Sequence, residues 1–275
     1  MTHYAIEVVP FGEDFGCARG AMEVAAAAES AGWDGLFIWD HMAFAWGVPA
    51  GDPWVMLAAA ATTTTRLRLG TSVAPLPRYR PHVLARTLTA LDTLSDGRLI
   101  LGAGLGGLAL EFGAFGEPED ERTRAEMMDE SLTVLDGLMS GEPLTYHGRH
   151  YSVEGISLRP TPVQRPRVPI WIGGDSRPAL RRAARWEGWI IGAVNEQQEM
   201  VKPPDRLAKQ VAYIGQHRQS DAPFDVAMSG CSRTSDRAKV AEYASAGMTW
   251  WLETLFGSRG SVAENKARIL DGPPV

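Results

Sequence analysis

The strongest constraint on the fold is an alternation, repeated eight times, of a short apolar run and a longer segment of helical character. The apolar runs show no regular change between polar and apolar residues, which is typical of strands covered by helices on both faces. Strands of this kind belong to parallel sheets, in which a helix connects each strand to the next. The expected strands are residues 4–9, 36–39, 67–73, 98–102, 168–172, 189–191, 224–228 and 249–252.

The segments between these runs carry helix signals. Asp52 is suited to cap a helix and Pro53 to stand at its first position, while the alanine-rich residues 21–31 end at Gly32, a common helix stop. The expected helices are residues 21–31, 53–64, 81–94, 124–139, 179–186, 205–218, 236–246 and 261–270. Eight strand–helix pairs in 275 residues predict the α/β class and a closed TIM (β/α)₈ barrel, which typically needs about 250 residues, as a single domain over residues 1–275.

One segment breaks the alternation. Residues 141–167 hold several prolines and a hairpin-like stretch at 144–151. A two-domain open sheet would need a linker near this point of the chain. Because the strand–helix pattern resumes directly afterwards, we interpret the segment as an insertion after the fourth helix of the barrel.

Composition excludes several classes of protein. With 45% hydrophobic and 22% charged residues the chain has enough apolar material for one large core. A formal net charge of -6 argues against nucleic acid and anionic membranes as partners, because both require a basic surface. No stretch approaches the roughly 20 apolar residues of a membrane helix. Cys17 and Cys231, the two cysteines, suit neither a disulfide framework nor a thiolate metal site, so we expect a cytoplasmic protein without a metal centre.

Glycines follow two of the expected strands. Residues 102–107, GAGLGG, match the GxGxxG pattern of dinucleotide-binding folds. The motif follows the fourth strand rather than the first, however, and no clear helix start comes after it. We therefore favour a glycine-lined cradle for a phosphate or a ring at the barrel rim, with plain close packing as the remaining alternative. Gly173, Gly174 and Ser176 precede the next helix and could form a similar anion cradle.

Asp40 and His41 end the second expected strand, and in a barrel such positions lie at the catalytic rim. A carboxylate beside an imidazole can hold its tautomer for acid–base catalysis, although a hydrogen-bonded structural histidine is equally consistent with the pattern. Glu253 ends the last strand and is either an acid of the pocket or a solvated residue. His147 and His150 lack a nearby third ligand, which argues against a metal site.

Four stretches, taken together and in this order, resemble the bacterial luciferase-like oxidoreductases. They are GLFIWDH at 35–41, RLRLGTSV at 66–73, LDTLSDGRLILGAG at 91–104, and PVQRP at 162–166 leading to PIWIGG at 169–174. Each stretch alone is weakly diagnostic. Their shared order along nearly the whole chain is specific for the superfamily.

The resemblance implies a barrel that binds coenzyme F420, a deazaflavin, or alternatively FMN at its C-terminal rim. It implies a non-prolyl cis peptide bond between Ser72 and Val73 behind the cofactor ring, His41 near the reacting carbon, and a homodimer. Asp40 before the histidine resembles the deazaflavin branch. The cofactor contacts that the resemblance implies are Ser72, Val73, Leu105, Gly106, Gly107, Gly173, Gly174 and Ser176.

The loop after His41 departs from the family. Deazaflavin-dependent sugar dehydrogenases carry a tryptophan four residues past the histidine, where this chain has Ala45, with Trp46 one position later. The substrate role of that tryptophan therefore cannot be transferred to this chain. Met42, Phe44 and Trp46 could instead wall an apolar pocket, although a packed loop is the simpler account.

The leading functional hypothesis is an oxidoreductase that acts on a small organic substrate. With F420 it would transfer a hydride between the cofactor and the substrate, and with FMN and oxygen it would oxygenate the substrate. His41, oriented by Asp40, would give or take the matching proton. A non-catalytic flavin-binding barrel is the alternative from another class, and a nicotinamide dehydrogenase is a third. The sequence does not name the substrate.

Overall fold

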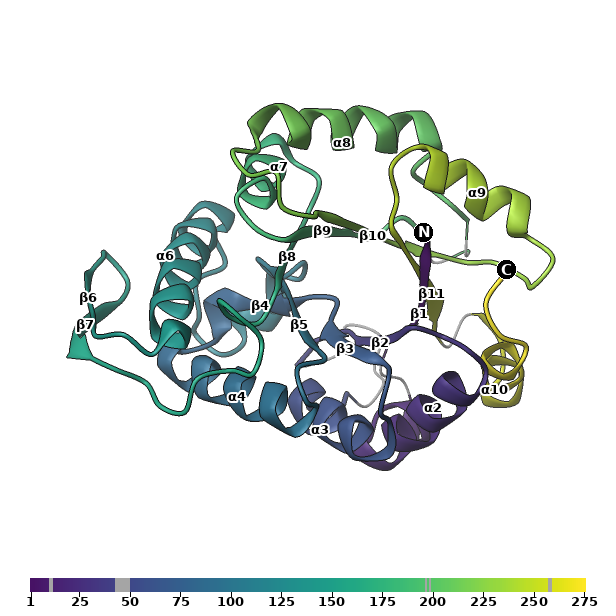
Figure 1. Ribbon diagram of the computed structural model, residues 1–275, viewed down its shortest axis with the longest axis horizontal. Coiled ribbons are helices and arrows are strands. Elements are labelled where there is room, and N and C mark those ends of the chain that lie inside the picture. The colour runs from purple at the N-terminus through teal and green to yellow at the C-terminus, as the bar shows by residue number, and fades with distance from the viewer. Residues whose placement is uncertain (10–11, 43–49, 196, 198, 257–258) are drawn as a thin grey trace.

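The computed structural model describes residues 1–9, 12–42, 50–195, 197, 199–256 and 259–275. Its main sheet is entirely parallel, with the strand order β3-β2-β1-β11-β10-β9-β8-β5-β4. A further pairing of β3 with β5 closes the sheet into a barrel, seen end-on in Figure 1. The strands are β1 (His3–Val8), β2 (Gly35–Ile38), β3 (Arg68–Thr71), β4 (Ala74–Pro75), β5 (Leu99–Gly104), β8 (Ile170–Gly173), β9 (Gly188–Ile191), β10 (Asp225–Gly230) and β11 (Trp250–Leu255).

Helices surround the barrel, which confirms the predicted TIM architecture (Figure 1). The long helices are α2 (Ala18–Ser30), α3 (Pro53–Thr63), α4 (Pro81–Leu94), α6 (Glu121–Ser140), α7 (Arg177–Ala183), α8 (Pro204–His217), α9 (Arg237–Ser245) and α10 (Val262–Leu270). The sequence did not predict the short elements α1 (Gly12–Phe15), η1 (Leu76–Arg78) and α5 (Leu110–Gly113).

An antiparallel hairpin stands between α6 and β8, in the segment interpreted as an insertion. It consists of β6 (Leu144–His147) and β7 (Ser152–Ile156) and projects from the side of the barrel in Figure 1. The Glu130 carboxylate of α6 accepts hydrogen bonds from the backbone N–H groups of Arg149, His150 and Tyr151, at 2.8–3.0 Å. The hairpin is thus attached to the barrel through α6.

The core has two parts because strand side chains point alternately into the barrel and outward to the helices. Between strands and helices lie Ala25 of the expected helix 21–31 and four residues of the expected strands, Leu69, Leu101, Ile172 and Val226, none more than 2% exposed. Their place in apolar runs or on an apolar helix face predicts this burial, and the structure confirms it. Inside the barrel a separate apolar layer is made of Ala5, Phe37, Ile100, Trp171, Ile190, Ala227, Trp250 and Leu252. This layer fills the middle of the barrel.

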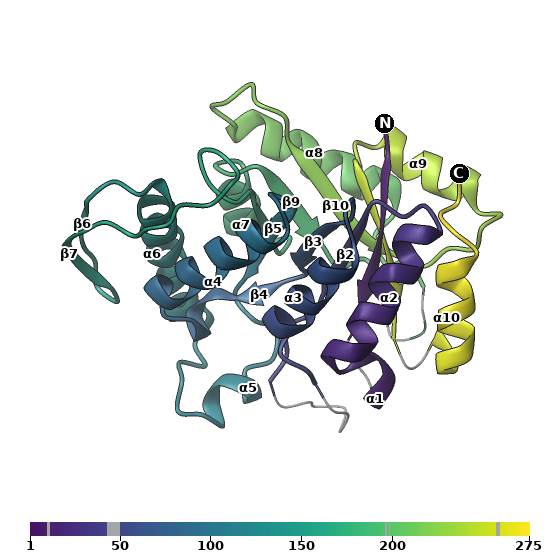
Figure 2. The same ribbon diagram turned by 60° about the horizontal axis from the view of Figure 1, so that its bottom comes forward.

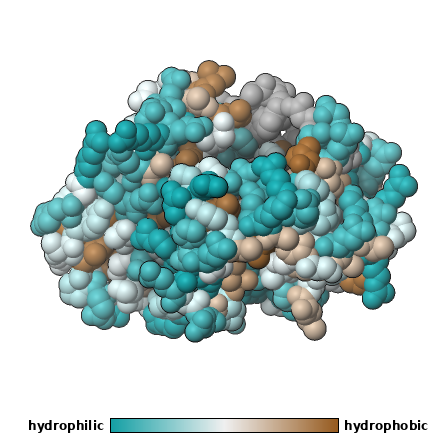
Figure 3. All heavy atoms as spheres, turned by 90° about the horizontal axis from the view of Figure 1, so that it is seen from above, coloured by the Kyte–Doolittle hydropathy of each residue, from teal (hydrophilic) through white to brown (hydrophobic). Residues whose placement is uncertain are grey.

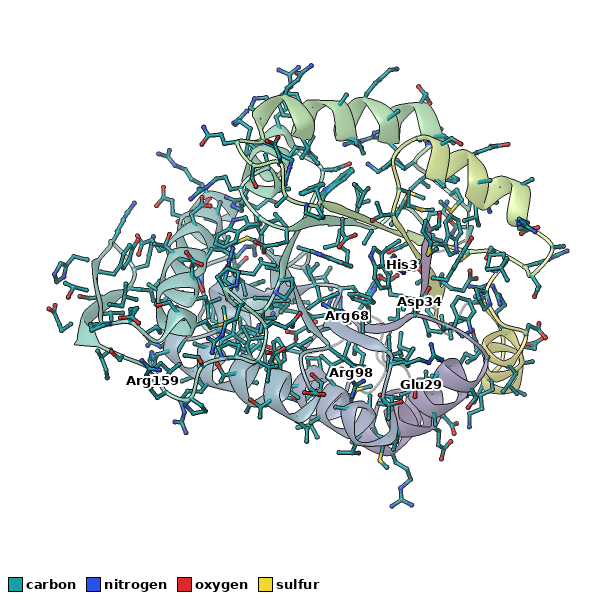
Figure 4. The ribbon with its side chains drawn as sticks, in the orientation of Figure 1. His3, Glu29, Asp34, Arg68, Arg98 and Arg159 are labelled. Carbon is teal, nitrogen blue, oxygen red and sulfur yellow. The ribbon has the colours of Figure 1, made fainter. Side chains whose placement is uncertain are left out.

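Polar contacts order the amino-terminal end of the barrel, where Figure 4 labels Glu29, Arg68 and Arg98. Glu29 of α2 accepts hydrogen bonds from three successive backbone N–H groups, those of residues 65–67. Burial alone would raise the pKa of Glu29, but these N–H groups outweigh it and lower the pKa to about 2. Arg98 donates to the carbonyl oxygens of residues 61, 64 and 67, which closes the end of α3. The connection from α3 to β3 is therefore held from both sides.

No helix in the part of the chain that the structure describes is long and apolar enough to cross a membrane. On the face seen in Figure 3, hydrophilic atoms predominate and hydrophobic residues are scattered. The amphipathic α8 follows this pattern, with Leu207 and Ile214 buried and most of its other side chains exposed.

Candidate active site

The residues predicted to bind and react lie at the carboxyl ends of the strands. Asp40 and His41 follow β2, and Ser72 and Val73 join β3 to β4. The peptide bond between Ser72 and Val73 is cis, which confirms the expectation from the family resemblance. Figure 2 shows α1 and α5, which follow β1 and β5, at the same end of the barrel. One end of the molecule thus gathers the candidate residues.

Two glycines make room for the Val73 side chain, and a third makes room for the backbone of Thr71. A Cβ at Gly104 would stand 2.3 Å from a Val73 methyl group, and one at Gly173 would stand 3.1 Å from it. A Cβ at Gly102 would stand 1.8 Å from the Thr71 carbonyl oxygen. The first two glycines of the GAGLGG motif therefore serve close packing against residues 71–73. A dinucleotide turn is not formed, because the sheet is a closed barrel.

The last two glycines of the motif differ from the first two. Gly106 has a left-handed φ of +86°, and a Cβ there would stand 2.5 Å from the Phe112 ring. Around Gly107, by contrast, no heavy atom of the described residues, apart from its chain neighbours, lies within 4 Å of the place a Cβ would take. Leu105 before them is partly buried against the core. Gly107 therefore borders open space at the rim.

Residues 173–176 form a tight turn at the end of β8. Gly174 has a φ of +97°, and its carbonyl oxygen accepts a hydrogen bond from the Trp189 indole at 2.7 Å. Asp175 is bound by Lys202 at 3.0 Å and by Arg206 at 3.1 Å. Ser176 caps α7, with its hydroxyl accepting from the Ala179 N–H. The turn is thus exposed to solvent yet held by contacts from β9 and α8.

The carboxylate paired with His41 is that of Glu111, which the sequence analysis did not single out. His41 Nδ1 lies 3.2 Å from both oxygens of Glu111, on the short helix α5. Arg78 of η1 approaches the same carboxylate, with Nη2 3.4 Å from Oε2. Both the Glu111 and the Arg78 side chains are almost fully buried. The expectation that Asp40 orients the His41 imidazole is corrected, because the carboxylate that contacts the ring is that of Glu111.

Asp40 is bound elsewhere. Its Oδ2 accepts a hydrogen bond of 2.6 Å from the Tyr79 hydroxyl, and its side chain is buried. Burial raises the pKa of Asp40 to about 6, although the Tyr79 hydroxyl and the Arg78 charge both act to lower it. Burial and the neighbouring Asp40 likewise raise the pKa of Tyr79. Asp40 and Tyr79 form a second polar pair beside the His41–Glu111 pair.

A third acid lies inside the barrel, above the apolar layer. Glu7 of β1 accepts hydrogen bonds from Ser229 at 3.0 Å and from Thr254 at 2.6 Å. Burial raises the pKa of Glu7, and these two hydroxyls oppose the rise, followed by Trp39 and Ser72. Trp39 Nε1 and Ser72 Oγ are close enough to Glu7 to affect its pKa, but within the described residues neither buried atom completes a hydrogen bond. Glu7 could not be identified from the sequence, where its only signal is a charge within an apolar run.

Glu253, by contrast, is a structural residue. It is fully buried and accepts hydrogen bonds from Ser232 and from the Trp251 indole. It also forms ion pairs with Arg259 and Arg268, the latter on α10. Among the residues that the structure describes, no group of three or more His, Cys, Asp or Glu side chains is placed to hold a metal ion.

The described part of the rim offers polar groups and accessible backbone to a bound ring. Among the described residues, the buried Ser72 Oγ and Trp39 Nε1 near Glu7 complete no hydrogen bond, and a ring with polar edges would satisfy them. The open space beside Gly107 and the exposed turn at Gly174 leave the backbone accessible on the β5 and β8 side. The residues named for the substrate pocket at 44–46 lie outside the described residues. Met42 is described and half exposed.

Comparison with known proteins gives a family. The model of the luciferase-like monooxygenases matches residues 13–270. An uncharacterized protein of Mycobacterium tuberculosis is 29% identical over 221 residues, 74% of each chain. An F420-dependent glucose-6-phosphate dehydrogenase of Microbacterium testaceum is 34% identical over 176 residues, which are 62% of this chain and 51% of that enzyme.

Solved structures share the fold. An F420-dependent secondary alcohol dehydrogenase, solved with an F420–acetone adduct, aligns over 99% of this chain and 98% of its own with a TM-score of 0.79 and 16% identity. The oxygenating constituent of a 3,6-diketocamphane monooxygenase from Pseudomonas putida, solved with FMN, aligns over 88% and 72% with a TM-score of 0.68 and 20% identity. At these identities the likeness establishes the barrel and no more.

The raised pKa of Asp40 gives a test of its environment. With a folded-state pKa of about 6 and an ordinary value of 3.8, the folded protein binds more protons than the unfolded chain between pH 4 and 6. This group therefore lowers the free energy of unfolding as pH rises through that window, by roughly 1–3 kcal/mol. Asp40→Asn removes the effect. Its free energy of unfolding relative to wild type should accordingly increase from pH 4 to pH 7, measured by urea denaturation.

The control is Asp205→Asn. Asp205 is exposed, and its hydrogen bond with Lys209 lowers its pKa, so the same increase should not occur. A stability difference between Asp40→Asn and wild type that stays constant across this pH range would show that Asp40 is not the buried, proton-binding group described above.

Proposed function

The chain belongs to the luciferase-like monooxygenase family and is an oxidoreductase of the flavin or deazaflavin type; we propose that its cofactor is coenzyme F420, with FMN as the alternative. The proposed substrate is a small organic molecule. The observation that carries the proposal is the His41–Glu111 pair, placed at the same rim as Ser72, Val73 and the open glycine turns. The pair gives the rim a group that can transfer a proton, which a non-catalytic barrel does not require.

F420 is preferred over FMN for two reasons. The dehydrogenase of Microbacterium testaceum, at 34% identity, is named as F420-dependent. Asp40 directly before the histidine also resembles the deazaflavin branch. Bound F420 would supply hydride exchange at its central ring. The residues proposed to hold it are Ser72, Val73, Leu105, Gly106, Gly107, Gly173, Gly174 and Ser176.

His41 is proposed to move the proton that accompanies the hydride. An ionised carboxylate can only accept hydrogen bonds, so the bond to Glu111 places the hydrogen on His41 Nδ1. His41 Nε2 is then the ring nitrogen that can take up or release a proton. Asp40 contributes in this proposal through the Tyr79 contact and its charge, since the imidazole is oriented by Glu111.

We also propose a homodimer, through the helices that follow β2 and β3. The helix α3, PWVMLAAAATT, is apolar on all sides, which is unusual for a helix that faces solvent. Its Val55 is 57% exposed, and Val83 on the neighbouring α4 is 54% exposed. A second copy of the chain would cover both. The chain is proposed to act as one domain, in the cytoplasm.

Cofactor titration tests the central proposal. Purified protein is titrated with F420 and with FMN, and binding is followed by quenching of cofactor fluorescence. We expect saturable binding of F420 with the lower Kd, because the site residues resemble the deazaflavin branch. Tighter binding of FMN would select the alternative, and binding of neither would contradict the proposal.

His41→Ala should lower turnover far more than it weakens F420 binding. A positioned acid or base contributes roughly 10²–10⁴ in rate, whereas the backbone turns that hold the cofactor do not involve this side chain. Turnover is followed by cofactor absorbance with a substrate selected from uncharged alcohols and ketones, and Kd by fluorescence. His82→Ala, at an exposed histidine of α4, is the control. Equal losses of turnover and F420 binding in the His41 variant would show that His41 lines the binding site without acting as an acid or base.

Val55→Asp should convert the dimer to a monomer, because an aspartate in an apolar interface loses its hydration without gaining a partner. The mass is measured by light scattering at micromolar concentration. Val201→Asp replaces a valine of similar exposure (52%) outside α3 and α4 and should leave the mass unchanged. A monomeric mass for the wild-type protein would contradict the proposed dimer.

A further inference from the structure

The Glu111 carboxylate needs an anchor other than its own helix. It belongs to α5, which has only four residues and lies in the segment between β5 and α6. A single helical turn is not stable without tertiary contacts. The position of Glu111 relative to His41 therefore depends on the side chains that surround α5.

Arg78 makes the contacts that anchor this segment. Its Nη2 lies 3.4 Å from Glu111 Oε2, and its guanidinium group packs on the Phe112 ring with a distance of 4.7 Å to the centroid. Its Nε lies 3.7 Å from Glu117 Oε2, beyond the end of α5. Arg78 is itself rigid, because it ends η1 directly after the strand β4 and only 7% of its side chain is exposed. One guanidinium group thus contacts both ends of the segment from Glu111 to Glu117.

Arg124 provides a contrast within the same cluster. It is buried on α6, and its guanidinium group packs on the same Phe112 ring at 4.4 Å. The ion pair to Glu111 is formed by Arg78. The two arginines therefore share a packing role on Phe112, and the contact to the carboxylate distinguishes Arg78.

We propose that Arg78 is a positioning residue that holds the Glu111 carboxylate against His41 Nδ1 and so keeps the neutral imidazole in its Nδ1–H tautomer. Arg78 also supplies the positive charge that balances the Glu111 carboxylate in its buried setting. This inference rests on the proposed role of His41 and adds the group that prepares it. Removing Arg78 frees the carboxylate to turn away, and the Nε2–H tautomer of His41 then appears.

The test measures the His41 tautomer directly. In protein labelled with ¹⁵N-histidine, the ring nitrogen shifts of His41 distinguish the two tautomers, and the signals are assigned by their loss in His41→Gln. The measurement is made without cofactor at a pH where the ring is neutral. Its outcome is therefore independent of whether F420 or FMN binds, and the failure of this inference can be told from the failure of the proposed function.

Wild type should show the Nδ1–H tautomer alone. Arg78→Met should show a mixture of the two tautomers. Its turnover should fall by about 10- to 10²-fold because the proton-transferring group is misplaced. Arg78→Lys should restore part of the wild-type tautomer pattern because it keeps the charge. Arg124→Met should keep the wild-type tautomer, as should Arg80→Met at an exposed neighbouring position. Circular dichroism confirms that each variant is folded. A single Nδ1–H tautomer in Arg78→Met overturns the proposal, and so does an equal change in Arg124→Met, which would assign the effect to packing on Phe112.

Discussion

The contact on which the rim depends is the shared carboxylate of Glu111. It joins three segments that are distant in sequence: the end of β2 through His41, the end of β4 through Arg78, and the loop after β5 through α5. Each of these segments leaves the barrel at the same end. The barrel itself supplies rigid strand ends, but it does not determine where the loops beyond them meet. The position where these loops meet is determined by one buried carboxylate, which contacts both an imidazole and a guanidinium group.

Along the barrel axis, the interior has an apolar layer that stabilises the fold and, nearer the carboxyl ends of the strands, a polar layer at the candidate site. The middle layer is apolar and aromatic, with the Trp171 ring stacked on Phe37 at 5.4 Å. One step further toward the carboxyl ends, the inward positions carry Glu7, Ser72 and the glycines of β5 and β8. A layer of acids, hydroxyls and glycines fills space poorly and stabilises the fold little. The apolar layer below it provides the packing that permits such a layer to exist.

The fold could be predicted from sequence because strands buried on both faces are continuous apolar runs, and all eight were recognisable. The site could be predicted only in part. His41 and Ser72 were identified by position and resemblance, but the partner of His41 was assigned to Asp40 because the two are adjacent in sequence. Asp40 and His41 lie beyond the end of β2, and their side chains contact different residues: Asp40 contacts Tyr79, whereas His41 contacts Glu111. Glu111 is 70 residues away from His41 in a glycine-rich segment without a clear helical pattern, and no local signal could have paired the two.

The buried acids of the barrel separate by the kind of partner that each one has. Glu253 is paired with two arginines, Arg259 and Arg268, so its charge is balanced within the protein and its role is to hold α10 against the barrel. Glu7 and Asp40 are bonded by hydroxyl groups, which stabilise a negative charge less than a cation does. Burial therefore prevails at both and raises their pKa values. A buried acid without an ion pair is costly to a fold. Glu7 and Asp40 both lie toward the rim that carries His41, the end of the barrel proposed above to bind the cofactor, whereas the buried Asp92 of α4 accepts hydrogen bonds from Gln164.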